Sequence, residues 1–288
     1  MGFPFFLGNF DSDAVITIYS GHADAELALR RQQEEISFPV PFDYLRAVRL
    51  SAAAKKLRDT NVSVLDVALE SAFGSHEGFT KAFSREFAIS PQRYRKETPA
   101  IPLFSYYPVR VRSAQTVDEK ENEEMKTSVI FTQVIERPAR KLILKRGVKA
   151  TDYYAYCEEV GCEVWGMLES IKGALYESIG VWLPEGMRKT GTSEYCQGVE
   201  VPADYVGAIP EGFDVIDLPA CKYLVFNGEP YEDEVFEEAI DAVWSAIDRY
   251  DPKPYGWEWA KESGPRFQLA PVGARGYIEA LPVREYKA

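Results

Sequence analysis

The second half of the chain contains an internal repeat, and this limits the folds open to it. Residues 134–141 read Val-Ile-x-x-Pro-Ala-x-Lys, and residues 215–222, which lie 81 positions later, read the same. At the same offset Gly147 corresponds to Gly228. The repeat predicts two copies of one structural unit related by a pseudo-twofold axis, with a cleft where the copies meet. A small ligand would bind in that cleft.

Each copy has the apolar patterning of a β-α-β-β unit. The expected strands are residues 142–144, 180–183 and 196–201 in the first copy, and 223–225, 266–270 and 276–283 in the second. The expected helices are residues 152–174 and 232–250, with Trp165 and Trp244 at comparable places, which favours core positions for both. Two such units predict an α+β domain with helices on one face of an antiparallel sheet.

Length and composition indicate a globular protein of two domains. The chain has 288 residues, of which 46% are hydrophobic and 27% are charged, and a domain holds about 150 residues. No apolar run reaches the roughly 18 residues of a membrane span, and the first residues lack a basic leader and a cleavage site. We therefore expect a cytoplasmic protein without a membrane partner.

Cysteine and histidine usage argues against metal or triad chemistry. The cysteines form no Cys-x-x-Cys pair and are expected to be reduced structural thiols; they are Cys157, Cys162, Cys196 and Cys221. The histidines are His22 and His76, which leaves little material for a histidine-rich metal site or a Ser-His-Asp constellation. We expect no metal, no cofactor and no catalytic residues.

The net charge of −12 is unevenly distributed along the chain. Residues 41–113 carry 12 basic and 7 acidic side chains, residues 127–288 carry 17 and 27, and residues 1–40, to which we assign no role, carry 2 and 6. Residues 114–126 include the run Asp-Glu-Lys-Glu-Asn-Glu-Glu, which predicts a solvated linker. A basic block inside an acidic chain points to a polyanionic partner for that block. A chance surface face is the alternative.

The basic block has the periodicity of a helix-turn-helix domain. One amphipathic helix is expected over residues 44–60, a short one begins with the capping box at 63–66, a third begins at Ser75, and a last short one begins at Ser90-Pro91. The third helix has a polar, partly cationic face opposite an apolar stripe, and the stripe consists of Phe79, Phe83 and Phe87. A helix of this kind, joined to a shorter one by a tight turn, fits a major groove.

Several motifs follow one another in this block. They are Arg49-Leu50-x-x-Ala53, Val67-Ala68-x-x-x-Ala72-Phe73-x-Ser75, the phenylalanine stripe, and Ser90-Pro91-x-x-Tyr94-Arg95. Over residues 43–97 they resemble the second helix-turn-helix unit of AraC-type bacterial transcription regulators. The resemblance implies that the helix beginning at Ser75 binds double-stranded DNA. The residues that it places toward bases or phosphates are Ser75, His76, Glu77, Thr80, Lys81 and Arg85.

Two departures from the AraC pattern bear on structure and assembly. The family usually has Gly where this chain has Ala72 and Ala88, so a positive φ would strain these alanines. The family also carries two helix-turn-helix units, and residues 1–40 show no convincing first copy, because residues 11–20 are strand-like and residues 23–35 suggest a single helix. Since one unit makes few contacts, we expect a homodimer or another partner to be needed on DNA.

The acidic half carries a second set of motifs. They are Ile216-x-x-Pro219-x-x-Lys222-Tyr223-x-Val225, Pro265-x-Phe267-Gln268 and Ile278-x-x-x-Pro282-Val283. Over residues 128–286 they resemble the gyrase-inhibitor-like (GyrI-like) effector-binding domain, which implies a metabolite- or drug-sensing pocket lined by aromatic residues. Gln268 stands where that family typically has a Glu as counter-charge. Because Gln cannot ionise, a cationic effector would need another carboxylate, such as Glu194 or Glu258.

The tryptophans all lie in this acidic half: Trp165, Trp182, Trp244, Trp257 and Trp259. Aromatic faces bind flat or cationic ligands through stacking and cation–π contacts, although they also fill protein cores. Trp257 and Trp259 alternate around Glu258 and would share one face of an extended segment. The expected ligand-binding residues are Tyr154, Trp182, Glu194, Tyr195, Trp257, Trp259 and Gln268.

We therefore expect a multidomain transcription regulator. An all-α helix-turn-helix DNA-binding domain at 41–113 would be followed, after the linker at 114–126, by an α+β domain of two β-α-β-β repeats at 127–288. A small aromatic or cationic effector bound in the second domain would modulate DNA binding. Two alternatives stay open: a small-molecule sequestering protein with a vestigial DNA-binding domain, and a small-molecule hydrolase. Gln268 weighs against the hydrolase, whose general base would be a Glu at that position.

Overall fold

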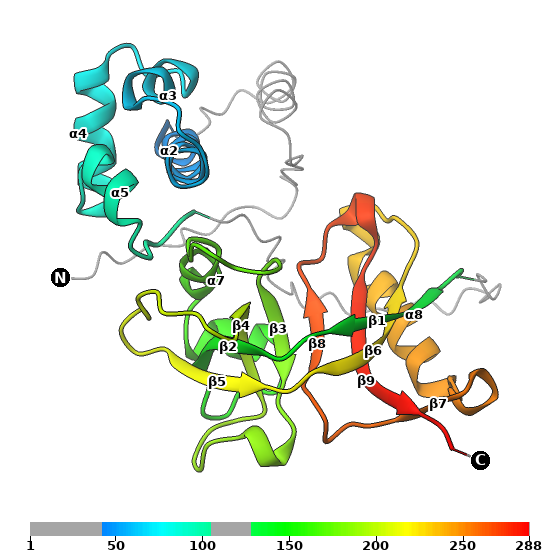
Figure 1. Ribbon diagram of the computed structural model, residues 1–288. Helices are drawn as coiled ribbons and strands as arrows, with labels where there is room; N and C mark the ends of the chain where they lie inside the picture. Colours follow the sequence, from blue (N-terminus) through cyan, green and yellow to red (C-terminus); the bar gives the residue numbers. More distant parts are fainter. Residues whose placement is uncertain (1–41, 105–127, 288) are drawn as a thin grey trace. The chain divides into compact units, whose positions relative to one another are not determined.

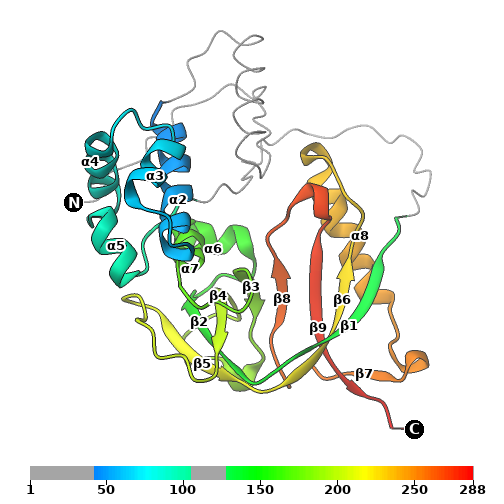
Figure 2. The same ribbon diagram turned by 45° about the horizontal axis from the view of Figure 1, so that its top comes forward.

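The computed structural model describes residues 42–104 and 128–287 (Figures 1 and 2). The expectations for residues 1–40 and for the linker at 114–126 lie outside the described residues. By its contacts the chain divides into two units, of which Arg46–Tyr106 with Thr127–Ala288 form one. None of the helices in the described ranges combines the length and the apolar character that a bilayer crossing requires.

The described helical region follows the expected order. Its helices are α2 (Phe42–Asp59), α3 (Val64–Glu70), α4 (His76–Phe87) and α5 (Pro91–Glu97) (Figure 1). Leu50, Ala54 and Leu57 of α2 are buried, as their helical spacing predicts, and they belong to one apolar core with the buried side chains of α3, α4 and α5.

The phenylalanine stripe packs α4 into this core. The ring centroid of Phe83 lies 5.6 Å from that of Phe79 and 4.8 Å from that of Phe87. It also lies 5.6 Å from the ring of Tyr94 on α5. Aromatic pairs in such tilted or edge-to-face arrangements contribute about 0.5–1.5 kcal/mol each beyond the area they bury. The stripe therefore fixes α4 against α5 and leaves the opposite face of α4 free for other contacts.

Serines begin the helices as the sequence predicts. Ser75 Oγ accepts a hydrogen bond from the backbone N–H of Gly78 at 3.0 Å, and Ser90 Oγ accepts one from the N–H of Arg93 at 3.3 Å. Ser63 caps α3 in the same way. Each bond satisfies an N–H group that the first helical turn leaves without a partner.

The turns after α3 and α4 hold two alanines in the left-handed region. The φ angle is 56° at Ala72 and 55° at Ala88. An L-residue in this conformation is strained by roughly 1–2 kcal/mol, because its Cβ crowds the following carbonyl oxygen. The chain therefore adopts a positive φ at both of these positions without glycine, which is the case in which strain was expected.

Nine strands in the described residues form one antiparallel sheet. They are β1 (Phe131–Arg137), β2 (Arg140–Arg146), β3 (Ile179–Trp182), β4 (Tyr195–Pro202), β5 (Asp214–Leu218), β6 (Cys221–Asn227), β7 (Trp257–Trp259), β8 (Arg266–Leu269) and β9 (Ile278–Glu285). The order across the sheet is β1-β6-β9-β8-β3-β4-β2-β5, and β7 pairs with β9 (Figure 2). The expected α+β class with two β-α-β-β copies is confirmed, and β1, β5 and β7 add to it.

The two copies exchange their first strands. β1 precedes β2 in the chain but pairs with β6 of the second copy, whereas β5 precedes β6 but pairs with β2 of the first copy. The copies also meet where β3 pairs with β8 at the centre of the sheet, with Gly180 opposite Gln268 and Trp182 opposite Arg266. Each half of the sheet therefore contains a strand from the other copy.

The helices of the sheet domain are α6 (Tyr153–Glu159), α7 (Glu163–Glu169) and α8 (Phe236–Arg249), with 3-10 turns at η1 (Glu185–Met187), η2 (Asp233–Val235), η3 (Lys253–Tyr255) and η4 (Gly273–Arg275). The prediction of one helix over residues 152–174 is wrong. Gly161 has a φ of +111°, which no right-handed helix accommodates, so the segment breaks into α6 and α7. The expected helix at 232–250 is confirmed in α8.

Candidate functional site

The polar face of α4 carries the residues that the sequence places on DNA. His76, Glu77, Lys81 and Arg85 are exposed, and Thr80 is half-buried. Lys81 and Arg85 lie on the side of the helix away from the buried phenylalanine stripe, whereas the helical spacing places His76 and Thr80 nearer to that stripe. Among the described residues, neither Lys81 nor Arg85 has an ion-pair partner. Both cations are therefore available to an external anion.

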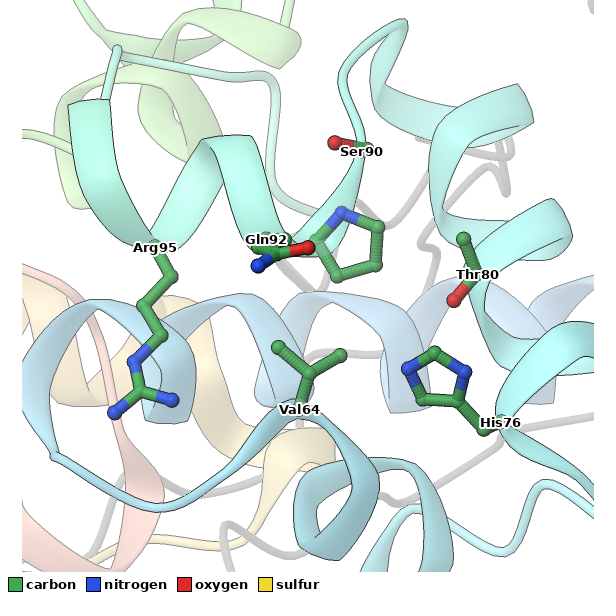
Figure 3. Close-up of a pocket in the computed structure, with 7 residues that line it drawn as sticks. Val64, His76, Thr80, Ser90, Gln92 and Arg95 are labelled. Atoms are coloured by element: carbon green, nitrogen blue, oxygen red, sulfur yellow. The ribbon is translucent and has the colours of Figure 1, made fainter.

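A concave surface lies beside α4. Its cavity has a volume of about 550 Å³ and is lined by Val64, His76, Thr80, Ser90, Pro91, Gln92 and Arg95. Figure 3 shows His76 and Thr80 of α4 on one side, Gln92 and Arg95 of α5 on another, and Val64 of α3 between them. Arg95 is held in place because its Nη2 donates to the carbonyl oxygen of Asn61 at 2.7 Å. This lining has hydrogen-bond donors and no carboxylate, which suits an anionic ligand.

Three of the expected ligand-binding residues lie together on one face of the sheet. Trp182 on β3 is in register with Tyr195 on β4, and their ring centroids are 5.0 Å apart in a T-shaped arrangement. Gln268 on β8 donates from Nε2 to Tyr195 Oη at 3.4 Å. Directly paired residues of an antiparallel ladder project from the same face. The side chains of Trp182, Tyr195 and Gln268, with those of their ladder partners on the same face, therefore form one surface, which we call the central surface.

β9 extends the central surface with a buried acid. Tyr277 Oη lies 2.9 Å from Gln268 Oε1 and 3.0 Å from Glu279 Oε2. Glu279 is fully buried and also accepts hydrogen bonds from Trp244 Nε1, at 2.8 Å, and from Arg266 Nε. Since Arg266 balances its charge, Glu279 is occupied within the protein and is not a free counter-ion for a cation.

Two glutamines flank Gly180 on the central surface. Gly180 is in register with Gln197 on β4 and with Gln268 on β8. A Cβ at Gly180 would lie 2.4 Å from Tyr195 Oη, so glycine is required for the tyrosine to cover the strand. Gln197 is 0% exposed, and neither atom of its amide has a hydrogen-bond partner among the described residues. An unpaired buried polar group costs about 1–3 kcal/mol, which a polar ligand atom would recover.

The tyrosines of the central surface remain protonated. Burial raises the pKa of Tyr195 well above its ordinary value. Burial, followed by the negative charge of Glu279, raises the pKa of Tyr277 in the same direction. Both phenols therefore keep their O–H groups as hydrogen-bond donors and carry no negative charge.

The other expected ligand-binding residues lie elsewhere. Tyr154 on α6 packs its ring edge-to-face with Tyr153 and is partly exposed. Trp257 and Trp259 both contact a second apolar cluster beneath α8, where Trp259 stacks on Phe226 at 6.4 Å. Both tryptophans are half-buried and pack against this cluster, away from Trp182 and Tyr195.

Glu194 lies at the border of the central surface. Its backbone oxygen accepts a hydrogen bond from the N–H of Leu183 at 2.8 Å, and its carboxylate accepts one from Arg188 Nη2 at 2.7 Å. Trp244, expected in the core, is 38% exposed, whereas Trp165 is buried as expected.

Comparisons with known proteins address the helical region. Residues 29–97 match a helix-turn-helix domain family. The match begins before the expected domain boundary at residue 41 and includes residues 29–40, to which the sequence assigned no role. The chain therefore has a helix-turn-helix region, which includes α2–α5, followed by an antiparallel sheet domain with helices.

Individual relatives match part of the chain. The right origin-binding protein of Escherichia coli (strain K12) is 37% identical over 82 residues, which are 28% of this chain and 27% of that protein. The HTH-type transcriptional activator AarP of Providencia stuartii is 43% identical over 53 residues, 18% of this chain and 39% of that protein. The match to this chain thus covers about a quarter of the first relative and about two fifths of the second.

Among solved structures, that of SAV2435 bound to tetraphenylphosphonium matches with a TM-score of 0.37 and 18% identity. The match covers 54% of this chain and 94% of that one.

A cavity at the end of the central surface includes residues that sequence reasoning missed. It has a volume of about 200 Å³ and is lined by Trp182, Leu183, Pro184, Arg188, Lys261, Arg266, Leu281 and Pro282. The sequence could have indicated Arg266, because this residue lies two positions before Gln268 and so projects from the same face of β8. Arg188 and Lys261 have no such signal, since tertiary folding alone brings them to Trp182.

Proposed function

We propose that this protein is a DNA-binding transcription regulator of the AraC type whose sheet domain binds a small-molecule effector. The observation that carries the proposal is the polar face of α4, where Lys81 and Arg85 are exposed and have no ion-pair partner among the described residues. The match of residues 29–97 to helix-turn-helix domains supports it, and so does the similarity to an origin-binding protein and to a transcriptional activator.

α4 has the dimensions and chemistry for the major groove. Its 12 residues make a helix roughly 18 Å long, and a helix diameter of about 10–12 Å matches the groove width of about 12 Å. Lys81 can donate to guanine or to a phosphate, Glu77 can accept from the amino group of cytosine, and Thr80 can serve either role. His76 and Arg85 lie near the two ends of the helix, on opposite sides of it, and are suited to backbone phosphates.

The concave surface beside α4 would hold a backbone phosphate. Thr80 Oγ1 is buried without a hydrogen-bond partner among the described residues, and Arg95 supplies a cation that Asn61 holds in place. Phosphates flank the major groove on both sides, so a helix in the groove brings its neighbouring surface against them. Such contacts fix the position of the helix without specifying sequence.

A single helix-turn-helix unit gives a small interface, and we propose that the protein binds DNA as a homodimer. Dimers of such units occupy half-sites about one helical turn apart, which is roughly 34–36 Å. Sedimentation with a two-half-site duplex should give two chains per duplex. A monomer that binds one half-site with nanomolar affinity at physiological salt would contradict dimeric binding.

The effector would bind against the central surface and its cavity. Trp182 and Tyr195 offer aromatic faces, and Gln197 offers an amide that lacks a partner. The effector can change the affinity for DNA only by the difference in its own affinity for the free and DNA-bound forms. A fluorescence screen of small molecules reports on this domain selectively, because the tryptophans all lie in it.

The experiment that tests DNA binding is selection of bound duplexes from a pool of random sequence. The full chain should enrich one motif, and Lys81→Ala and Arg85→Ala should each weaken binding to it at least fivefold. Lys149→Ala is the matched control, because Lys149 is an exposed lysine of the sheet domain. Its affinity should equal that of the unaltered chain.

The outcomes separate this proposal from its alternatives. Enrichment of no motif, or equal affinity in all four proteins, would contradict the DNA-binding role. If small molecules still bound, a sequestering protein would be the better description. Consumption of a bound molecule in excess of the protein concentration would instead indicate a hydrolase.

A further inference from the structure

The cavity beside Trp182 combines an apolar floor with a cationic rim. Trp182, Leu183, Pro184, Leu281 and Pro282 supply the apolar part. Its volume of about 200 Å³ is below the roughly 300–1,000 Å³ of sites for drug-sized ligands. A ligand of this site is therefore small and has an apolar body of one or two rings.

The rim is formed by Arg188, Lys261 and Arg266, and the described lining contains no carboxylate. The side chains of Arg188 and Arg266 are 37% and 35% exposed, and Lys261 is exposed as well. All three cations are thus reachable from solvent through the same cavity. Cations gathered around an apolar pocket repel one another and would repel a cationic ligand.

Both arginines are fixed in place before any ligand binds. Arg188 donates from Nε to the carbonyl oxygen of Leu183 at 2.8 Å and from Nη2 to Glu194 at 2.7 Å. Arg266 donates from Nε to the buried Glu279. Side chains that are already ordered lose little entropy on binding, which favours affinity.

Lys261 leaves the rim with one positive charge in excess. Glu194 and Glu279 each pair with one of the arginines. The neighbour of Lys261, Glu262, pairs instead with Arg284 at 2.9 Å. Among the described residues Lys261 itself has no ion-pair partner. Three cations against two carboxylates give a net charge of +1 at an open cavity.

We infer that this cavity binds a small organic anion, an aromatic carboxylate, with its ring against Trp182 and its carboxylate between Lys261 and the two arginines. The inference rests on the proposed effector role of the sheet domain and names the chemical class of that effector. It reverses the charge expected from the GyrI-like resemblance. The reason is that Glu194 and Glu279 already pair with arginines, whereas Lys261 on the rim has no ion-pair partner among the described residues.

The test is isothermal titration calorimetry of the full chain with three matched probes: 2-naphthoate, 2-naphthamide and 2-naphthylmethylammonium. The probes share one ring system and differ in charge. The carboxylate should bind at least tenfold more tightly than the neutral amide, and the ammonium should bind more weakly still. The affinity for the carboxylate should fall as salt rises from 50 to 500 mM, because screening weakens charge pairing.

Two variants locate the site. Lys261→Gln removes the cation without an ion-pair partner, leaves the fold intact, and should weaken 2-naphthoate binding about fivefold while leaving 2-naphthamide unchanged. Lys149→Gln is the control, and it should change neither. Arg188→Gln should have the same selective effect as Lys261→Gln, since Arg188 lies on the same rim.

Two results would overturn the inference. One is binding of the ammonium probe as tightly as the carboxylate, which would leave effector binding standing and refute only its charge. The other is no heat from any of the three probes. Neither result bears on the DNA-binding role, which the duplex selection measures separately.

Discussion

Arg266 lies over the ring of Trp182, with its guanidinium carbon 4.8 Å from the ring centroid. The two residues are partners in the β3–β8 ladder, where the two sequence copies meet. The same guanidinium donates to the buried carboxylate of Glu279 on β9. One side chain therefore connects an aromatic wall of the cavity, the junction of the copies and a buried charge.

Replacing Arg266 should destabilise the sheet domain. In Arg266→Gln the buried Glu279 loses its counter-charge, and a charged hydrogen bond of this kind is worth about 1.5–3 kcal/mol. We expect the free energy of unfolding in urea, followed by tryptophan fluorescence, to fall by about 2 kcal/mol. The double variant Arg266→Gln with Glu279→Gln should recover part of the loss. Equal stability of Arg266→Gln and the unaltered chain would show that the pair contributes nothing.

Relieving the left-handed alanines should stabilise the helical region. Ala72→Gly and Ala88→Gly remove the Cβ strain, and although glycine costs entropy in the unfolded chain, each should add about 0.5–1 kcal/mol. Circular dichroism at 222 nm is the measurement, because tryptophan fluorescence reports only on the sheet domain. Ala82→Gly, within α4, is the control and should destabilise by about 1 kcal/mol. A loss of stability in both turn variants would contradict the strain.

The sequence predicted the helical region well because its signals are local. Three phenylalanines four residues apart determine which face of α4 is buried, and a serine before each helix determines where α3, α4 and α5 begin. The positive φ of Ala72 lies at a position where the AraC pattern usually has glycine. The same spacing of the phenylalanines predicts that the opposite, polar face of α4 is exposed.

The strand exchange in the sheet could not be predicted in this way. The expected strands did not include β1 and β5, and the apolar pattern within a strand does not determine which partner the strand pairs with. The ladder chosen depends on how the two copies pack, as the pairing of β1 with β6 shows. The cavity was missed for the same reason, since Arg188 and Lys261 are far apart in the sequence and meet only after folding.

Thiol reactivity should differ sharply between the cysteines. Burial raises the pKa of Cys196 to about 12, and burial likewise raises the pKa of Cys157 to about 12. At pH 8 only about one in ten thousand of these thiols is ionised, and the thiolate is the reactive form. Cys162 is exposed, so iodoacetamide should alkylate it first, as mass spectrometry would show. Modification of Cys196 at the rate of Cys162 would contradict the burial.

Acid should remove the contribution of Asp214 to stability. A hydrogen bond from Arg146 Nε, at 2.8 Å, lowers the pKa of Asp214 below its usual value. A carboxylate with a lowered pKa stabilises the fold above the pKa of the unfolded chain, about 3.9, and this contribution is lost as pH falls through the folded value. The Tm of Asp214→Asn should lie below that of the unaltered chain at pH 6, and the difference should shrink as pH falls below about 3.9. A difference that is constant with pH would contradict this linkage.

The salt dependence of DNA binding tests the central claim most directly. The logarithm of the association constant for a duplex is measured against the logarithm of salt concentration for the unaltered chain, Lys81→Ala, Arg85→Ala and the control Lys149→Ala. If α4 contacts the phosphate backbone, each of the first two variants should bind more weakly and lower the magnitude of the slope by about one. The control should match the unaltered chain. Slopes and affinities that are the same in all four proteins would contradict DNA binding by α4.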